Sequence, residues 1–457
     1  MSVAEHHDQH SLKPFPVTAE AARWIANLQG KDIPQAAYDR AKHALLDWLG
    51  CAIAGQGEPL TGILREEFAG GNDNACTLIA SGRRASLHHA ALINGAASHA
   101  LDYDDVNRRL HGHPTVCIAP ATLALGETLS SNGRDVLTAF IAGTEVACAL
   151  GEMSGDGHYE AGFHATGTIG TFGAAAAAAK LMGLDAQTSA NALAIAASQA
   201  AGLKANFGTM TKPLHAGKAA MNGLLAARLA ARGYSASETA IEGPHGFAQA
   251  QAPGFAPMPV RADDNAPYAV EQMLYKFHAS CFLTHSTLNA IRSLRESSGF
   301  GLDEIESAVL KIRSTHASVC CIPEPATGLE IKFSIQHLAA MGLGGADTAA
   351  LETFSDENAN DPRNVDARKR IRLDLTDDMD RSAALVTIRL KDGRTLTGED
   401  NVGVPAQDPQ EQWRKLSAKF TSLAALVLGA ERSEELRERI GALENENDIS
   451  TLMTAAG

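Results

Sequence analysis

The chain has 457 residues, 45% hydrophobic and 20% charged, so it is long enough to bury a large core and to divide into two or three domains. Its formal net charge of −14 argues against nucleic acid as the main partner, because phosphate binding needs a basic face. Seven cysteines without a C-x-x-C spacing argue against a secreted disulfide framework, and they offer no zinc or iron–sulfur ligand set.

The first residues, MSVAEHHDQHSLKPFPV, have neither the basic region nor the apolar core of a signal peptide. No run of 18 apolar residues stands out further along the chain, so a membrane-spanning segment is not expected. We therefore predict a cytoplasmic protein that neither spans nor inserts into a membrane.

Helical periodicity dominates the first 265 residues. Apolar residues recur every three or four positions at 32–55, 92–101 and 116–130. After a glycine-rich segment at 151–162, expected to be a loop, come Ala- and Gly-rich helices at 162–185, 186–201 and 216–232. Gly202 and Gly233 stand just past the ends of the last two, as helix C-caps prefer. Small residues let helix axes approach closely, so this part is predicted to be all-helical.

The pattern changes at the proline-bounded segment 259–267, which is typical of a linker. Alternating apolar residues at 308–313, 371–375 and 386–390, with an Asp392-Gly393 turn, predict strands, and helices are expected at 284–295 and 334–341. Helical spacing returns at 413–427 and 436–443. We predict a mainly α protein with an α+β unit in its middle third. If the last helices pack back onto the first domain, that unit is an insertion, and the family resemblance given below implies this arrangement: a large all-helical domain from residues 1–266 and 406–457 and a smaller inserted α+β domain at 267–405.

The first stretch with chemical potential is residues 94–115, which places three carboxylates, among them Asp102, close to two imidazoles, among them His113. Pro114 disfavours helical geometry at His113. Carboxylates at a helix end and a fixed histidine beyond it are typical of an acid/base site. A capped helix end with solvated aspartates fits the same spacing equally well.

The second stretch is residues 208–220, with Lys212, His215 and Lys218 around the expected start of a helix. Helix N-termini carry partial positive charge and free N–H groups, so these side chains could bind a carboxylate or phosphate. In the first turn, Lys218 would oppose the helix dipole unless an anion were bound. A solvated basic turn is the alternative.

The third stretch, residues 276–294, contains Lys276, Cys281 and His285. A cysteine nucleophile is weakly supported, because no partner acid or oxyanion device accompanies Cys281, so His285 is preferred as anion ligand or acid/base group. His164 precedes the alanine-rich helix. A nucleotide site there is not expected, since neither G-x-G-x-x-G nor G-K-[ST] is present.

Together these stretches resemble the MmgE/PrpD family, which includes 2-methylcitrate dehydratases, cis-aconitate decarboxylases and iminodisuccinate epimerases. The resemblance is carried by NGAASHALDYDDV with GHPT, GFHATGTIGTFGAAAAAAKLMGLD, GTMTKPLHAGKAA, IEGPHGF, LEIKFSIQHLAA and LKDGRTL. It implies the two-domain fold predicted above, a cleft between the domains and a homodimer. It also implies that neither a metal nor an organic cofactor is needed.

The resemblance implies that Asp102, His113, Lys212 and a histidine near His285 line the substrate site. Two positions depart from the family pattern: Val106 stands where threonine is common, and the small-domain histidine aligns with Cys281 as well as with His285. We assign catalytic roles to Asp102, His113, Lys212 and His285, substrate binding to His164, His215, Lys218, Lys276 and Cys281, and no metal ligands.

The predicted function is that of a cofactor-independent lyase of the hydro-lyase type, acting on a small hydroxy-di- or tricarboxylate. Proton transfer at the carbon next to a carboxylate would be the central step, with cations stabilising the developing charge. A cis-aconitate-type decarboxylase and an epimerase of an imino- or aminodicarboxylate are alternatives. More remote ones are a magnesium-dependent prenyl-transferring helical enzyme using the DYDD run, and a non-catalytic helical scaffold.

Overall fold

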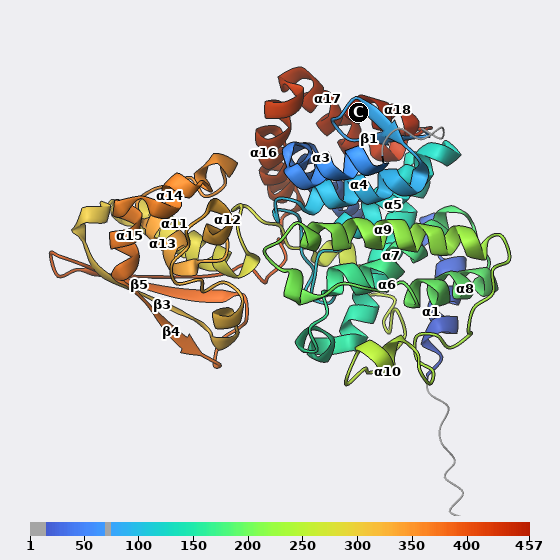
Figure 1. Cartoon of the computed structure of the whole chain (residues 1–457), viewed down its shortest axis with the longest axis horizontal. Helices are drawn as coiled ribbons and strands as arrows, with labels where there is room; N and C mark the ends of the chain where they lie inside the picture. The colour runs from blue at the N-terminus through green and yellow to red at the C-terminus, as the bar shows by residue number, and fades with distance from the viewer. Residues whose placement is uncertain (1–14, 69–74) are drawn as a thin grey trace, which may run out of the picture.

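The computed structural model describes residues 15–68 and 75–457 and arranges them as two lobes (Figure 1). The expectation that a signal peptide is absent rests mostly on residues 1–14, and these lie outside the described residues. The large lobe contains α1 (Val17–Asn27), α2 (Gln35–Ala54), α3 (Pro59–Phe68), β1 (Cys76–Leu78), β2 (Arg83–Ala85), α4 (Leu87–His99), α5 (Thr115–Leu129), α6 (Gly133–Glu160), α7 (Ala165–Leu181), α8 (Ala186–Ala197), α9 (Thr211–Ala230), α10 (Phe247–Gln251), α16 (Pro409–Leu428), α17 (Ala430–Gly441) and α18 (Ser450–Ala456).

Helix α7 is the centre of the large lobe and packs against α5, α6, α8 and α9 (Figure 1). Its residues from Ala165 to Ala179 are buried on all sides, which explains its lack of a polar face. Glycines permit the close crossings between these helices: a Cβ on Gly217 of α9 would lie 2.2 Å from the carbonyl oxygen of Leu92 in α4. The small-residue composition of the sequence is thus used for packing.

Two details of the large lobe differ from the sequence-based expectations. The segment 151–162 is not a loop, because α6 continues to Glu160 and only Gly155, with φ 55°, interrupts it as a kink. Helix α6 also contains an 18-residue window apolar enough to cross a membrane by length and composition, and 94% of that window is buried inside the protein. Burial in the core accounts for both the helix and its apolar character.

The helix expected at 216–232 begins earlier, at Thr211, with Pro213 in its first turn, where a missing N–H is tolerated. The large lobe also contains a short antiparallel hairpin, β1–β2, which the all-helical expectation omitted. The C-terminus lies against this hairpin, since the backbone N–H groups of Ala80 and Gly82 donate to the carbonyls of Ala456 and Gly457.

The small lobe is an α+β unit. Its sheet has the order β4-β3-β5-β6, with β3 and β4 parallel and the other neighbours antiparallel. Helices α11 and α13 pack against the sheet, and every second residue along β5 is fully buried. The elements are α11 (His285–Ser298), β3 (Ile305–Arg313), α12 (Gly328–Ile331), α13 (Ile335–Leu343), α14 (Asp356–Asn360), α15 (Pro362–Lys369), β4 (Ile371–Thr376), β5 (Ala383–Leu390) and β6 (Thr395–Asn401).

Each lobe has its own hydrophobic core. One core contains residues between Val17 and Tyr275 together with residues between Leu416 and Ala456, so both parts of the chain build the large lobe. The other runs from Cys281 to Leu390. The segment that includes Tyr268 and Met273 packs into the first core, so the small lobe's own core begins at Cys281. The predicted boundaries after residues 266 and 405 stay predictions.

Candidate active site

The loop between α4 and α5 carries the first predicted stretch, and it is conformationally unusual. Asp102 and His111 both have positive φ, 52° and 56°, in the left-handed region that non-glycine residues rarely adopt. Such strain is concentrated at functional sites, because surrounding contacts must maintain it. The loop thereby turns its carboxylates inward.

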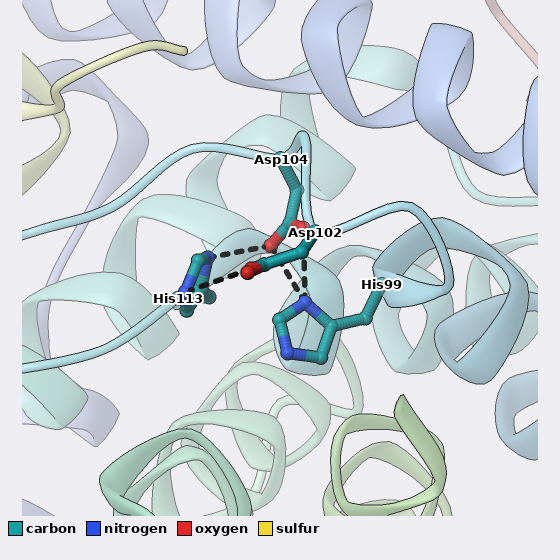
Figure 2. A group of neighbouring side chains, drawn as sticks. All are labelled: His99, Asp102, Asp104 and His113. Carbon is teal, nitrogen blue, oxygen red and sulfur yellow. Dashed lines mark hydrogen bonds and ion pairs between the residues drawn. The ribbon is translucent and has the colours of Figure 1, made fainter. Parts of the chain in front are cut away.

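Asp104 is placed between two imidazoles (Figure 2). Its carboxylate lies 2.9 Å from Nδ1 of His99 and 2.8 Å from Nδ1 of His113, and neither His99 nor Asp104 has an exposed side chain. The backbone N–H of His113 donates to Oγ1 of Thr166 in the first turn of α7. The imidazole of His113 is therefore held from both its ring and its backbone.

The protonation state of this group follows from burial and charge. Burial lowers the pKa of His99 to about 4, so His99 is neutral at pH 7. Burial alone would raise the pKa of Asp104, but the imidazoles of His99 and His113 hold it well below its usual value. An ionised Asp104 only accepts hydrogen bonds, so His99, which bonds to it through Nδ1, carries its proton on that atom. Nδ1 of His113 lies 2.8 Å from the same carboxylate without the alignment of a hydrogen bond, and its ring stands between the carboxylates of Asp104 and Asp102.

Asp102 faces that other ring nitrogen. Its Oδ1 lies 3.7 Å from Nε2 of His113 and 2.9 Å from the Nζ atoms of both Lys212 and Lys276. Burial would raise the pKa of Asp102, but the two ammonium groups hold it well below its usual value. Lys212 lies in the first turn of α9, where its charge opposes the helix dipole. The opposition between a lysine charge and the helix dipole, expected at Lys218, therefore occurs at Lys212.

Three buried lysines hold the backbone of this loop at three successive carbonyl oxygens. Lys332 donates to the carbonyl of Leu101 at 3.0 Å, Lys276 to that of Asp102 at 2.6 Å, and Lys419 to that of Tyr103 at 2.7 Å. These lysines come from the small lobe, from the segment before it and from α16, respectively. The loop therefore depends on contacts from parts of the chain far apart in sequence.

A second pair of imidazoles lies beside the first. Nδ1 of His164 is 3.0 Å from Nδ1 of His215, and the ring of His164 stacks on that of His99 with centroids 6.0 Å apart. Because the two Nδ1 atoms face each other, one must donate and the other must accept. Burial lowers the pKa of both rings: that of His164 lies well below its usual value, and that of His215 is also lowered. The pair is thus an uncharged proton donor and acceptor.

The remaining predicted residues are placed differently. Lys218 is exposed two turns into α9, not in its first turn, because that helix begins at Thr211. His285 directs Nε2 at the backbone carbonyl of Ser280 and packs edge-on against the ring of His278. Cys281 is buried, and the negative charge of Asp102 acts on its thiol. The structure brings Asp102, His113, Lys212, His164, His215 and Lys276 into one neighbourhood. Cys281 and His285 are influenced by charges of this group, those of Asp102 and Lys276 respectively, without a direct contact, and Lys218 lies apart.

Sequence reasoning assigned no role to His99, and none of its own to Asp104. The signal was present in SHALDYDD, because His99 at the end of α4 and Asp104 five residues later can meet across the following turn. It was overlooked because His99 fits the pattern of an Ala-rich helix and gives no separate sign of function.

His99, Asp102, Asp104 and His113 are also a set that could hold a metal ion, since one ligand atom from each lies within 4.8 Å of the others. No sequence spacing indicated this set, and the expectation that the chain has no metal ligands stays a prediction. The surroundings fit a metal poorly: Oδ1 of Asp102 is already 2.9 Å from two ammonium groups, which would repel a divalent cation. Asp104 is engaged by both imidazoles in the same way.

The geometry gathers imidazoles, carboxylates and lysine side chains at one place in a protein of two lobes with a helical main body. The chain belongs to the MmgE/PrpD family: residues 19–258 match the MmgE/PrpD N-terminal domain and residues 278–445 the MmgE/PrpD C-terminal domain. The C-terminal match extends through α16 and α17, which the structure places in the large lobe.

Three curated relatives are cis-aconitate decarboxylases. That of Aspergillus terreus is 28% identical over 476 residues, covering 96% of this chain and 95% of the relative. The mouse protein is 29% identical over 463 residues, with 95% and 92% covered, and the human protein 28% identical, with 96% and 94% covered. Decarboxylases are lyases, so the similarity supports a lyase as the general class of this chain.

Proposed function

We propose that this protein is a lyase that acts on a small polycarboxylate by moving a proton at the carbon next to a carboxylate. The observation that carries the proposal is the orientation of His113. Asp104 engages Nδ1, and Nε2 points toward Asp102, which binds Lys212 and Lys276. An imidazole placed between two carboxylates and beside two ammonium groups suits this chemistry.

Lys212 and Lys276 would hold the substrate carboxylate on which negative charge grows. They now bind Asp102 at 2.9 Å, so a substrate carboxylate would share or replace that contact. Charge-assisted hydrogen bonds of this kind are about twice as strong as neutral ones. His113 would then take or supply the proton through Nε2, while Asp104 stabilises the resulting imidazolium.

Decarboxylation of an unsaturated tricarboxylate of the cis-aconitate type is the specific reaction that we favour. It is supported by the similarity to cis-aconitate decarboxylases along 95–96% of this chain. In this reaction the bond to the departing carboxylate breaks, carbon dioxide leaves, and the electron pair left on carbon takes a proton from the imidazolium of His113. One proton-transfer group is enough.

Dehydration of a hydroxy-tricarboxylate is the second candidate, and the His164–His215 pair favours it. Elimination of water needs a base for the proton on carbon and an acid for the leaving hydroxide. His164 stacks on His99 and lies 3.0 Å from His215, so a second proton-transfer group is available beside the first.

The test is proton NMR of purified protein with citrate, 2-methylcitrate, cis-aconitate, malate and aspartate-derived dicarboxylates, combined with measurement of released carbon dioxide. We expect loss of cis-aconitate with one carbon dioxide per turnover, unaffected by a chelator. New olefinic signals from a hydroxy acid without carbon dioxide would support the dehydratase instead. Turnover that vanishes on chelation, or none across the panel, would contradict the proposal.

A further inference from the structure

Lys332 is a buried lysine whose surroundings leave most of its hydrogen-bonding capacity unused. It follows α12 in the small lobe, and its side chain crosses to the large lobe, where Nζ donates to the carbonyl of Leu101. The residue is 9% exposed. An ammonium group has three N–H donors, and the contact with Leu101 uses one of them.

The other buried lysines around this loop have carboxylate partners, and Lys332 does not. Lys276 binds Asp102 at 2.9 Å and Lys419 binds Asp47 at 2.6 Å. Among residues 15–68 and 75–457, no carboxylate lies within 4.0 Å of the Nζ atom of Lys332. Burying a charge without a counter-ion is costly, so such a group is expected to receive an anion.

The charges that face Lys332 are arranged around the candidate active site. The negative charges of Asp102 and Glu58, both beyond ion-pair distance, favour the charged form of Lys332, whereas the positive charges of Lys276 and Lys212 disfavour it. The centre of the Phe354 ring lies 5.4 Å from Nζ of Lys332. Burial is the largest influence and lowers the pKa of Lys332 to about 8. The amine is therefore part-way through its titration at mildly alkaline pH.

We propose that Lys332 binds a carboxylate of the substrate from the small-lobe side of the site, at a distance from the carboxylate held by Lys212 and Lys276. The inference rests on the proposed function and adds to it that the carboxylates of the substrate are bound by lysines of both lobes. Such a ligand connects the two lobes at the place where Lys332 of the small lobe donates to the carbonyl of Leu101 in the large lobe.

This role has a signature that a structural lysine would lack. An anion beside Lys332 favours the ammonium form and raises its pKa, so ligand binding near pH 8 takes up protons from the buffer. A lysine that only braced the backbone of Leu101 would keep the same protonation state with and without ligand.

The experiment is isothermal titration calorimetry of the full chain at pH 8 with propane-1,2,3-tricarboxylate, a saturated ligand that lacks the double bond. Titrations in two buffers of different ionisation enthalpy give the number of protons taken up. The proteins are wild type, Lys332→Met, Lys332→Arg and the matched control Lys391→Met, an exposed lysine at the turn after β5. Circular dichroism verifies folding.

We expect Lys332→Met to weaken binding about 10- to 100-fold and to abolish proton uptake, as for the loss of a charged hydrogen bond. Lys332→Arg should retain binding without proton uptake, because arginine stays charged, and it decides the matter if the methionine variant is unfolded. Lys391→Met should match wild type. Equal affinity and uptake in wild type and the Lys332 variants would overturn this inference alone, whereas a wild type that binds no tricarboxylate would also overturn the proposed function.

Discussion

Asp104 determines how both neighbouring imidazoles are oriented, although the sequence singled out Asp102. One buried carboxylate faces Nδ1 of His99 and Nδ1 of His113, so the orientation of both rings depends on it. A carboxylate that fixes a histidine's tautomer and stabilises its charged form is a known device of acid/base catalysis. Asp102, which contacts two lysines, has a different environment.

Replacement of Asp104 by asparagine should lower kcat about 10²-fold or more with little change in KM, because an amide can donate to Nδ1 and thus favour the wrong tautomer. Steady-state kinetics on the substrate found by NMR would measure the effect. Asp105→Asn is the matched control, because Asp105 is buried next to Asp104 in sequence but accepts a hydrogen bond from the hydroxyl of Thr115 and contacts neither imidazole. Equal losses in the two variants would contradict the role of Asp104.

At the scale of elements, α16 connects the C-terminal part of the chain to the site. Its Lys419 is buried, binds Asp47 of α2 at 2.6 Å and donates to the carbonyl of Tyr103 in the loop between α4 and α5. The C-terminal helices therefore contribute directly to the geometry around Asp102 and Asp104.

Lys419→Met should destabilise the protein by about 3–5 kcal/mol, because it leaves the carboxylate of Asp47 buried without its partner. Urea unfolding followed by circular dichroism would measure the loss. Adding Asp47→Asn should recover part of it, since the unpaired charge is then removed. A single variant as stable as wild type, or a double variant with fully additive losses, would be inconsistent with a buried ion pair.

At the scale of the whole molecule, buried neutral histidines make stability depend on pH. Burial lowers the pKa of His99 and of His278 to about 4, against 6.5 in an unfolded chain. Below pH 6.5 the unfolded chain therefore binds protons that the folded chain excludes, and each histidine's contribution is lost between pH 6.5 and 4. At about 1.4 kcal/mol per pKa unit, the loss is roughly 3 kcal/mol for each.

Unfolding free energies measured between pH 4 and 8 should accordingly fall on the acid side. His278→Gln should flatten this dependence whatever its effect on stability at pH 8, whereas His245→Gln, at an exposed position, should leave it unchanged. A wild-type stability independent of pH from 6.5 to 4 would contradict the buried neutral state of these rings.

Much of the helical body was predictable, because periodic apolar residues and alanine-rich segments leave little choice of structure. The prediction failed at 151–162, where glycines suggested a loop but packing in the core maintains α6 to Glu160. At the site, the acids and His113 were found because they are close in sequence. Lys332 was not, because it meets Leu101 across 231 positions of the chain, a distance that no local pattern reports.

The most direct test of this account is to run the reaction identified by NMR in deuterated water, with wild type and with His113→Ala. We predict that wild type places solvent deuterium on the carbon next to a carboxylate. His113→Ala should lose turnover and deuterium incorporation together, by about 10²- to 10⁴-fold, while still binding the tricarboxylate. If His113→Ala incorporates deuterium at the wild-type rate, His113 does not move the proton and the proposed mechanism is wrong.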